Sequence, residues 1–424
     1  MSKSIFPKDF FWGVSTASHQ VEGGTENQWS TWELAHAKEL AKSAEQRLGM
    51  LPIWDEIKTE AQDPQNYVSG KGVEHYKRYK EDFAIVEKLG LNAFRFGIEW
   101  SRVQPEEGTW DEKALEHYRD YIAELQARDI EPFVNLWHWT MPTWFTDKGG
   151  FKYRKNLSYW RKFVQKISDE FGSDIRYVIT INEPNVYASF SYATGEWPPQ
   201  EKNWLNASRV IWNLVLAHKI AYKTLKKDHP HLSIGIAAQL ANIQAKRPHN
   251  FIDELMTKWM RMFWNWWFMN RIRKQQDFVG FNYYFSDYYK YFHRDNPGQP
   301  QNDLGWYMEP EGLYPLLLRA WSHYKKPIFI TENGVADRTD QYRQWWLEET
   351  IIAMERALSE GIDVRGYFHW SLLDNFEWKY GWWPKFGLVE VDREHDMKRT
   401  IRPSGRWLAR KIQAMKHGSP PTKE

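Results

Sequence analysis

Eight short apolar runs alternate with longer amphipathic stretches along this chain of 424 residues. The runs occupy residues 10–18, 93–100, 132–139, 177–183, 233–239, 278–284, 327–332 and 364–371. In one intervening stretch the apolar residues 115, 118, 122 and 125 step by 3, 4 and 3, as on one buried face of a helix. Eight strand-then-helix units predict an α/β fold, a single (β/α)8 TIM barrel with elaborated βα loops. A doubly wound sheet would carry a Gly-x-Gly-x-x-Gly turn after its first strand, and this chain has none there.

We expect one catalytic domain spanning residues 1–424, because α/β barrels of this length commonly form a single unit. The largest insertion, residues 34–72, lies between the first and second runs and carries many charges with scattered Gly and Pro. It is predicted to be a loop with short helices over the mouth of the pocket. The tail, residues 418–424, is predicted to be frayed.

The composition argues against several classes of protein. Lys and Arg number 57 against 55 Asp and Glu, for a net charge of +2, so no electrostatic footprint for nucleic acid is expected. Cysteine is absent, which excludes disulfides and thiolate chemistry. The N-terminus has no apolar signal-like segment and no run approaches the roughly 18 residues of a membrane span, so we expect a soluble, cytoplasmic protein without a membrane partner. No metal-ligand spacing is present, and no metal or cofactor is expected.

Two glutamates stand at the ends of the fourth and seventh runs. Glu183 closes Tyr-Val-Ile-Thr-Ile-Asn-Glu, and Glu332 closes Pro-Ile-Phe-Ile-Thr-Glu. Such runs are typical of parallel strands buried on both faces, so both carboxylates are expected at the carboxyl edge of the barrel, where these folds build their sites. Two converging carboxylates are the minimal equipment for cleaving a glycosidic bond. Pro184 predicts an extended backbone at Glu183.

Other strand ends supply matching chemistry. Arg95, on the second run, is a permanent cation that would lower the pKa of a neighbouring carboxylate, although a plain salt bridge in the barrel wall is the alternative. Asn282 and Tyr284 alternate on the sixth run, so both point the same way and can donate hydrogen bonds. His138 ends the third run, where it is either a site residue or a satisfied core histidine.

Several ordered motifs together resemble glycoside hydrolase family 1, the retaining β-glycosidases often described as β-glucosidases. They are Phe-Trp-Gly at 11–13, Gln-Val-Glu-Gly at 20–23, Phe-Arg-Phe-Gly-Ile-Glu-Trp-Ser-Arg at 94–102, His-Trp at 138–139, Asn-Glu-Pro at 182–184, Asn-Tyr-Tyr at 282–284, Thr-Glu-Asn-Gly at 331–334 and Trp-Ser-Leu-Leu-Asp-Asn-Phe-Glu-Trp at 370–378. The resemblance covers nearly the whole chain.

This resemblance implies roles that the residues alone do not assign. Glu183 would be the acid/base and Glu332 the nucleophile, with Arg95 and Tyr284 supporting the nucleophile. The hydroxyls of the sugar in the cleavage subsite would be held by Gln20, His138, Trp139, Asn182, Glu377 and Trp378. Ring platforms would be formed by Trp370 and Phe386, and Trp306 would face the leaving group.

The implied activity is a two-step, retaining hydrolysis of terminal β-D-glucosyl residues, and of galactosyl or fucosyl residues, in small glycosides and short oligosaccharides. A transglycosylase would use the same covalent intermediate, and a non-catalytic sugar-binding protein is an alternative of another class. A 6-phosphoglycosidase is disfavoured because the Glu377 carboxylate would repel a phosphate. The preferred sugar and the oligomeric state stay open.

The chain departs from the family pattern between residues 239 and 278, a stretch that looks shorter than the family's equivalent. It holds Trp259, Trp264, Trp266 and Trp267 among basic residues. A packing role is favoured over an acceptor platform, a dimer contact or an interfacial membrane helix. The membrane helix is placed last because the sequence shows no clean polar face.

Overall fold

The computed structural model describes residues 5–417, and its centre is a closed barrel of eight parallel strands. The predicted frayed tail therefore lies outside the described residues. The strands are β1 (Phe11–Ser15), β2 (Ala93–Gly97), β3 (Glu131–Asn135), β4 (Tyr177–Asn182), β5 (Ser233–Gln239), β7 (Val279–Tyr283), β10 (Ile328–Asn333) and β11 (Val364–Trp370). Each falls on one of the eight predicted runs, and β11 closes the barrel by pairing with β1 from Phe11 opposite Gly366 to Ser15 opposite Trp370. The predicted (β/α)8 fold is confirmed.

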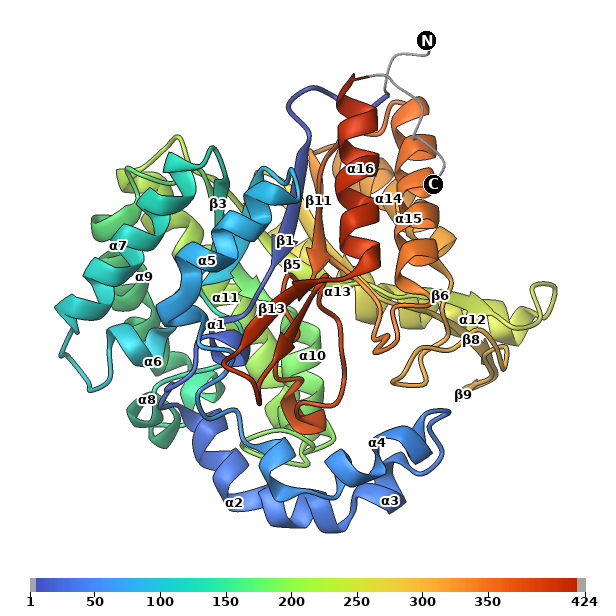
Figure 1. The fold of residues 1–424 in the computed structure, drawn as a ribbon, viewed down its shortest axis with the longest axis horizontal. Coiled ribbons are helices and arrows are strands. Elements are labelled where there is room, and N and C mark those ends of the chain that lie inside the picture. Colours follow the sequence, from blue (N-terminus) through green and yellow to red (C-terminus); the bar gives the residue numbers. More distant parts are fainter. Residues whose placement is uncertain (1–4, 418–424) are drawn as a thin grey trace.

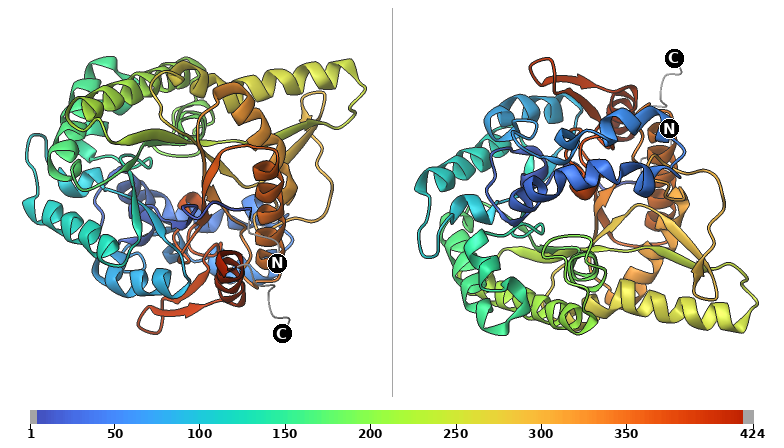
Figure 2. Two further views of the ribbon diagram at one scale, coloured as in Figure 1. Left: turned by 90° about the horizontal axis from the view of Figure 1, so that it is seen from above. Right: turned by 90° about the horizontal axis from the view of Figure 1, so that it is seen from below.

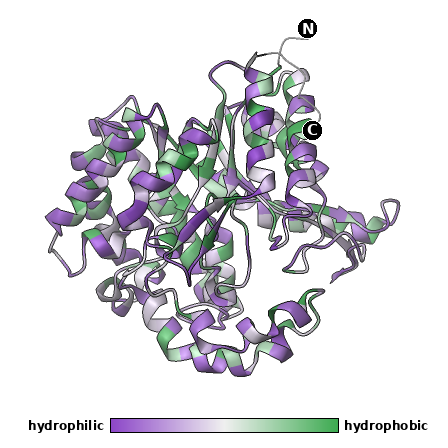
Figure 3. Cartoon of the chain, viewed as in Figure 1, coloured by the Kyte–Doolittle hydropathy of each residue, from purple (hydrophilic) through white to green (hydrophobic). Residues whose placement is uncertain are grey.

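Aromatic side chains fill the interior of the barrel below the carboxyl ends of the strands. The rings of Phe133 and Tyr177 stack with centroids 4.3 Å apart, and Phe329 and Phe368 close around them. These residues lie at the start or middle of their strands, so they form a packed floor and leave the carboxyl ends free for polar side chains. Hydrophobic residues accordingly concentrate along the central strands in Figure 3.

Helices surround the barrel, as the two end views of Figure 2 show. The longer ones are α5 (His75–Lys88), α7 (Glu112–Ala127), α9 (Leu157–Phe171), α11 (Trp204–Asp228), α14 (Leu313–Tyr324), α15 (Arg343–Ser359) and α16 (Pro403–His417). The predicted apolar stripe of α7 is confirmed, since Leu115, Tyr118, Ile122 and Leu125 are all buried. No helix among residues 5–417 is both long enough and apolar enough to cross a membrane.

The predicted insertion consists mainly of helices at the carboxyl end of the strands (Figure 1, lower edge). They are α2 (Gln28–Lys42), α3 (Ala44–Leu48), α4 (Trp54–Ala61) and the 3-10 turn Pro64–Tyr67. Asn66 ties the insertion to the loop after β11, because its amide oxygen accepts from the Trp382 N–H at 2.9 Å and its amide nitrogen donates to the Tyr380 carbonyl at 3.0 Å. That loop carries Glu377 and Trp378, so the insertion supports the segment that holds these two predicted site residues.

Smaller elements complete the chain. A three-stranded sheet joins β6 (Asn242–Ala245), β8 (Ser286–Lys290) and β9 (His293–Arg294), and β12 (Val389–Asp392) pairs with β13 (Lys398–Ile401). Helix α12 (Phe251–Arg261) continues through a π-helical turn, Met262–Trp266, into α13 (Trp267–Ile272) and projects from the side of the barrel (Figures 1 and 2). The short helices are α1 (Ser18–Val21), α6 (Trp100–Val103), α8 (Thr143–Asp147) and α10 (Pro184–Ala188).

Candidate active site

Glu332, near the end of β10, has a hydrogen-bond donor on each carboxylate oxygen. Arg95, on β2, donates to Oε1, and the Tyr284 hydroxyl donates to Oε2 at 2.6 Å. Glu332 is only 3% exposed, and Arg95 is fully buried. A permanent cation and a hydroxyl donor together stabilise a negative charge on this carboxylate.

Glu183, directly after β4, has a different environment. Its one hydrogen bond among the described side chains comes from the Asn282 amide nitrogen, at 2.8 Å. The Thr331 hydroxyl donates to the Asn282 amide oxygen at 2.7 Å, which turns the amide nitrogen toward Glu183. Burial and the charge of Glu332 raise the pKa of Glu183 well above its usual range. Of the two glutamates, Glu183 therefore has the environment that favours the protonated form.

The predicted extended backbone at Glu183 is wrong. Its φ and ψ are 42° and 62°, in the left-handed region. The chain turns within this one residue from β4 into α10, whose first residue is Pro184. The Glu183 N–H donates to the Ala237 carbonyl at 2.7 Å, and its carbonyl accepts from the Tyr187 N–H at 3.2 Å. Contacts with the neighbouring strand and the following helix thus override the local preference imposed by proline.

Asn182 connects both glutamates to the third strand. Its amide oxygen accepts from Arg95 at 2.7 Å and from Asn282 at 3.3 Å, so its amide nitrogen faces His138 Nε2, 3.0 Å away. Burial and the charge of Arg95 lower the pKa of His138 well below its usual range. The neutral ring therefore accepts at Nε2 from Asn182. The Trp139 indole N–H donates to the Asn182 carbonyl at 3.0 Å.

Gln20 and Glu377 form a second polar group beside the carboxylates. The Gln20 amide nitrogen donates to the Phe376 carbonyl at 2.6 Å and lies 3.4 Å from Glu377. Its amide oxygen is buried without a hydrogen-bond partner among the described residues. Burial and the charge of Glu332 raise the pKa of Glu377 to about 8. An unpaired acceptor beside a protonated carboxyl group suits the hydroxyls of a sugar.

Aromatic rings enclose these polar groups. The Trp378 ring lies 4.9 Å from Trp139 and 6.0 Å from His138, and the Trp370 ring lies 5.9 Å from His138. On the other side, Tyr284 lies 6.0 Å from Trp306 and 6.1 Å from Phe386, measured between centroids. Hydrogen bonds and ring contacts thus bring together all the residues proposed for the site from the sequence, at the carboxyl end of the barrel.

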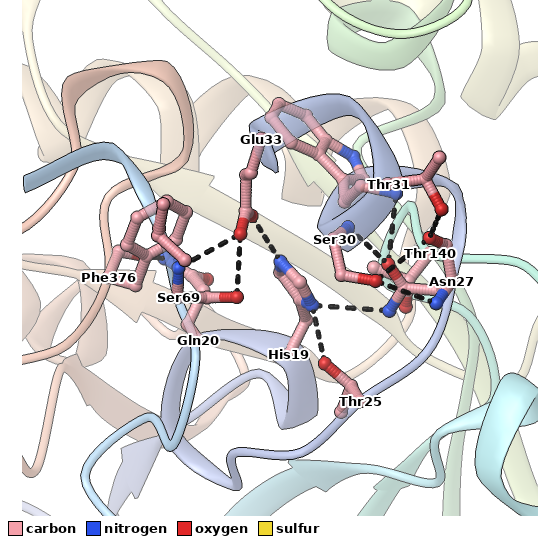
Figure 4. A network of polar contacts seen from close by, with 12 residues as sticks. His19, Gln20, Thr25, Asn27, Ser30, Thr31, Glu33, Ser69, Thr140 and Phe376 are labelled. Carbon is pink, nitrogen blue, oxygen red and sulfur yellow. Dashed lines mark hydrogen bonds and ion pairs between the residues drawn. The ribbon is translucent and has the colours of Figure 1, made fainter. Parts of the chain in front are cut away.

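A buried polar network missed by the sequence analysis holds Gln20 in place (Figure 4). His19, its neighbour, contacts Glu33 on α2 through Nε2 at 2.7 Å and Thr25 through Nδ1 at 2.9 Å. The second Glu33 oxygen accepts from the Ser69 backbone N–H at 2.9 Å and hydroxyl at 2.7 Å. The network joins α1 to both ends of the insertion. Thr331 was missed in the same way, and neither periodicity nor strand position signals such partners.

Among residues 5–417, no group of three or more His, Asp or Glu side chains is arranged to hold a metal ion. The polar chemistry of this site consists of carboxyl, amide, hydroxyl and guanidinium groups. A barrel of this kind with two buried carboxyl groups at its strand ends in opposite environments has the arrangement of a glycoside hydrolase. The chain belongs to glycosyl hydrolase family 1, whose model matches residues 2–274 and 268–417. The predicted family and enzyme class are confirmed.

Known relatives cover the chain almost completely. Beta-glucosidase A of Thermotoga maritima is 32% identical over 464 residues, which cover 97% of this chain and 99% of the relative. The solved beta-glycosidase from Pyrococcus horikoshii is 32% identical with a TM-score of 0.85, covering 98% of this chain and 96% of that one. Beta-glucosidase from Thermotoga maritima in complex with glucoimidazole is 29% identical with a TM-score of 0.86, covering 97% and 99%.

Proposed function

We propose that this protein is a retaining exo-β-glycosidase that removes terminal β-D-glucosyl residues, and galactosyl or fucosyl residues, from small glycosides and short oligosaccharides. The proposal depends on one observation, the opposite environments of the two glutamates. Arg95 and Tyr284 donate to Glu332, whereas burial and repulsion raise the pKa of Glu183. One carboxyl group is ready to attack while the other is ready to give a proton.

In the first step, Glu332 attacks the anomeric carbon and the bond to the leaving oxygen breaks. Glu183 gives its proton to that oxygen, so the alcohol leaves neutral and the sugar stays bound to Glu332 as an ester. As the ester forms, Glu332 loses its negative charge, so Arg95 and Tyr284 no longer donate to a charged carboxylate. Asn182, held between Arg95 and His138, is placed to bind a sugar hydroxyl.

In the second step, the roles of Glu183 reverse. Esterification removes the negative charge of Glu332, which is the second-largest cause of the raised pKa of Glu183. The pKa of Glu183 then falls, and its carboxylate takes a proton from water as the water attacks the anomeric carbon. The sugar is released with its original anomeric configuration, and Glu332 regains its charge.

Specificity for an unsubstituted terminal sugar is supported by the groups around Gln20. Its unpaired amide oxygen and the Glu377 carboxyl can hold neighbouring hydroxyls, with Trp370 and Phe386 as ring platforms. Glu377, with a pKa of about 8, is protonated at neutral pH, so like-charge repulsion of a 6-phosphate is weaker than the sequence argument assumed. The neighbouring Lys379 is paired with Glu196, which still disfavours phosphate binding.

The test is the anomer that appears first when the protein hydrolyses an aryl β-glucoside, followed by proton NMR. The β anomer is expected, and early release of the α anomer would overturn the retaining mechanism. Relative kcat/KM values for aryl β-glucoside, galactoside, fucoside, mannoside and 6-phosphoglucoside then define the sugar. Transfer to added alcohol in preference to water would favour the transglycosylase alternative.

A further inference from the structure

Helix α12 turns its apolar side to solvent. The exposed residues of α12 and of the turn that follows are Phe251, Ile252, Leu255, Trp259, Met262 and Phe263, each between 44% and 77% exposed. We call this set the α12 apolar face. The Trp259 and Phe263 rings stack on each other with centroids 5.6 Å apart. The packing role favoured from the sequence is correct for Trp266, which is buried, but wrong for Trp259.

The side of α12 that faces the small sheet of β6 and β8 is polar. Its buried residues are Asp253 and Thr257. Asp253 accepts two hydrogen bonds from Arg247, at 2.8 and 3.0 Å, and one from the Tyr291 N–H at 2.8 Å. The Thr257 hydroxyl donates to the Asp253 carbonyl at 2.9 Å. A surface helix of a globular protein normally shows the opposite pattern. The polar contacts hold α12 with its apolar face directed outward.

Cations are frequent in the segment that carries this face. Residues 246–274 contain seven Lys or Arg but only two acidic residues, Asp253 and Glu254, whereas the whole chain has a net charge of only +2. Asp253 is already neutralised by Arg247. Lys258 lies on α12 itself, and Arg273 and Lys274 are exposed just after α13. The segment that carries the α12 apolar face is therefore strongly basic.

We propose that the α12 apolar face docks on an anionic lipid bilayer, with the helix lying in the plane of the interface. Apolar side chains enter the boundary of the acyl chains while flanking cations meet anionic headgroups, a combination that defines interfacial helices. Helix α12 has 11 residues, too few to span a bilayer. A second copy of the chain is disfavoured as the occupant, because a symmetric contact would bring this cationic segment against itself. The docking does not depend on the proposed function.

The docked helix is connected to the candidate active site. The Trp264 indole N–H donates to the Gln239 side chain at the end of β5, and the Asn185 amide donates to the Trp264 carbonyl at 3.2 Å. Asn185 lies two residues after Glu183 in the chain. A membrane surface bound at α12 would therefore lie on the side of the barrel that carries the segment after Glu183.

The experiment measures sedimentation of the full chain with vesicles of phosphatidylcholine, with and without phosphatidylglycerol. We expect binding to the anionic vesicles, weakened by high salt, and an about 10-fold or greater loss of vesicle affinity in Leu255→Glu/Trp259→Glu. Leu34→Glu is the matched control, because Leu34 is 72% exposed on α2, away from this face. It should bind like the unaltered protein. Hydrolysis of a soluble aryl β-glucoside should be unchanged in all variants, which shows that they are folded.

Three results would overturn the proposal. The first is no sedimentation of the unaltered protein with either vesicle. The second is an equal loss of binding in Leu34→Glu and Leu255→Glu/Trp259→Glu. The third is a dimer, by light scattering, that the double substitution converts to a monomer, because the face would then be covered by a second copy of the chain.

Discussion

Arg95, on β2, and Glu332, on β10, form a buried ion pair inside the barrel, although 237 positions separate them in the sequence. The pair is isolated from water, so each charge depends on the other for its stability. The same guanidinium also donates to Asn182, which lies beside Glu183. The cation therefore sets the charge of one glutamate and the position of groups around the other.

Substitution of each glutamate should separate the two steps of the reaction. Glu332→Ala is expected to abolish turnover of every substrate, because no carboxylate remains to attack. Glu183→Ala should slow substrates with poor leaving groups by about 10²- to 10⁴-fold and spare those with good leaving groups, which need no proton. Values of kcat/KM for dinitrophenyl and alkyl β-glucosides measure the difference. Full activity of Glu332→Ala on any aryl glycoside would refute the assignment.

Tyr284→Phe should lower kcat/KM by about 10- to 100-fold, since it removes a hydrogen bond of about 1.5–3 kcal/mol to the Glu332 charge. The ring and its contacts with Trp306 and Phe386 are kept. Tyr283→Phe is the control, because the Tyr283 hydroxyl donates to the Glu309 carbonyl, away from both glutamates. Equal losses in the two variants would show that the effect is structural.

The pKa of Glu183 should fall in Glu332→Gln, because the substitution removes a negative charge that raises it. Carbon NMR of labelled glutamate side chains can follow this titration in the inactive variant. In Glu377→Gln the fall should be smaller, because Glu377 raises the pKa of Glu183 less than Glu332 does. In the active protein the same ionisation should appear as the loss of kcat/KM at high pH. An unchanged Glu183 titration in Glu332→Gln would contradict the coupling.

Glu377 should make the free energy of unfolding depend on pH. Its folded pKa of about 8 lies above the ordinary value of 4.5, so its contribution to stability is full below about pH 4.5 and is lost as the pH rises through about 8. Glu377→Gln should flatten the pH profile of stability in this window. Urea unfolding at a series of pH values measures it. A variant whose profile parallels that of the unaltered protein would argue against burial of the charge.

Glu33→Ala should destabilise the fold by about 2–4 kcal/mol, because it leaves His19 and both donors of Ser69 without their buried partner. Glu39→Ala, on the exposed side of the same helix, should change stability by no more than about 0.5 kcal/mol. Urea unfolding at neutral pH compares the two variants. Equal effects would show that the network in Figure 4 contributes little.

The amino-acid sequence by itself determined the eight strands, their barrel and the two glutamates at strand ends. These features arise from periodicity over a few neighbouring residues and from the rule that parallel strands end at one edge. The motifs around Glu183 and Glu332 also indicated the family to which the chain belongs. Such signals are local, so they are readable without knowing which strands meet.

Only the tertiary structure decided how these groups act together. The left-handed backbone of Glu183 comes from contacts with Ala237 and Tyr187, and the network of His19 joins segments far apart in the chain. The outward apolar face of α12 is set by Asp253, whose partners lie in other elements. Each depends on tertiary packing, which brings different segments into hydrogen-bonding range and buries charged side chains. Local sequence patterns do not specify the distances between residues of separate segments.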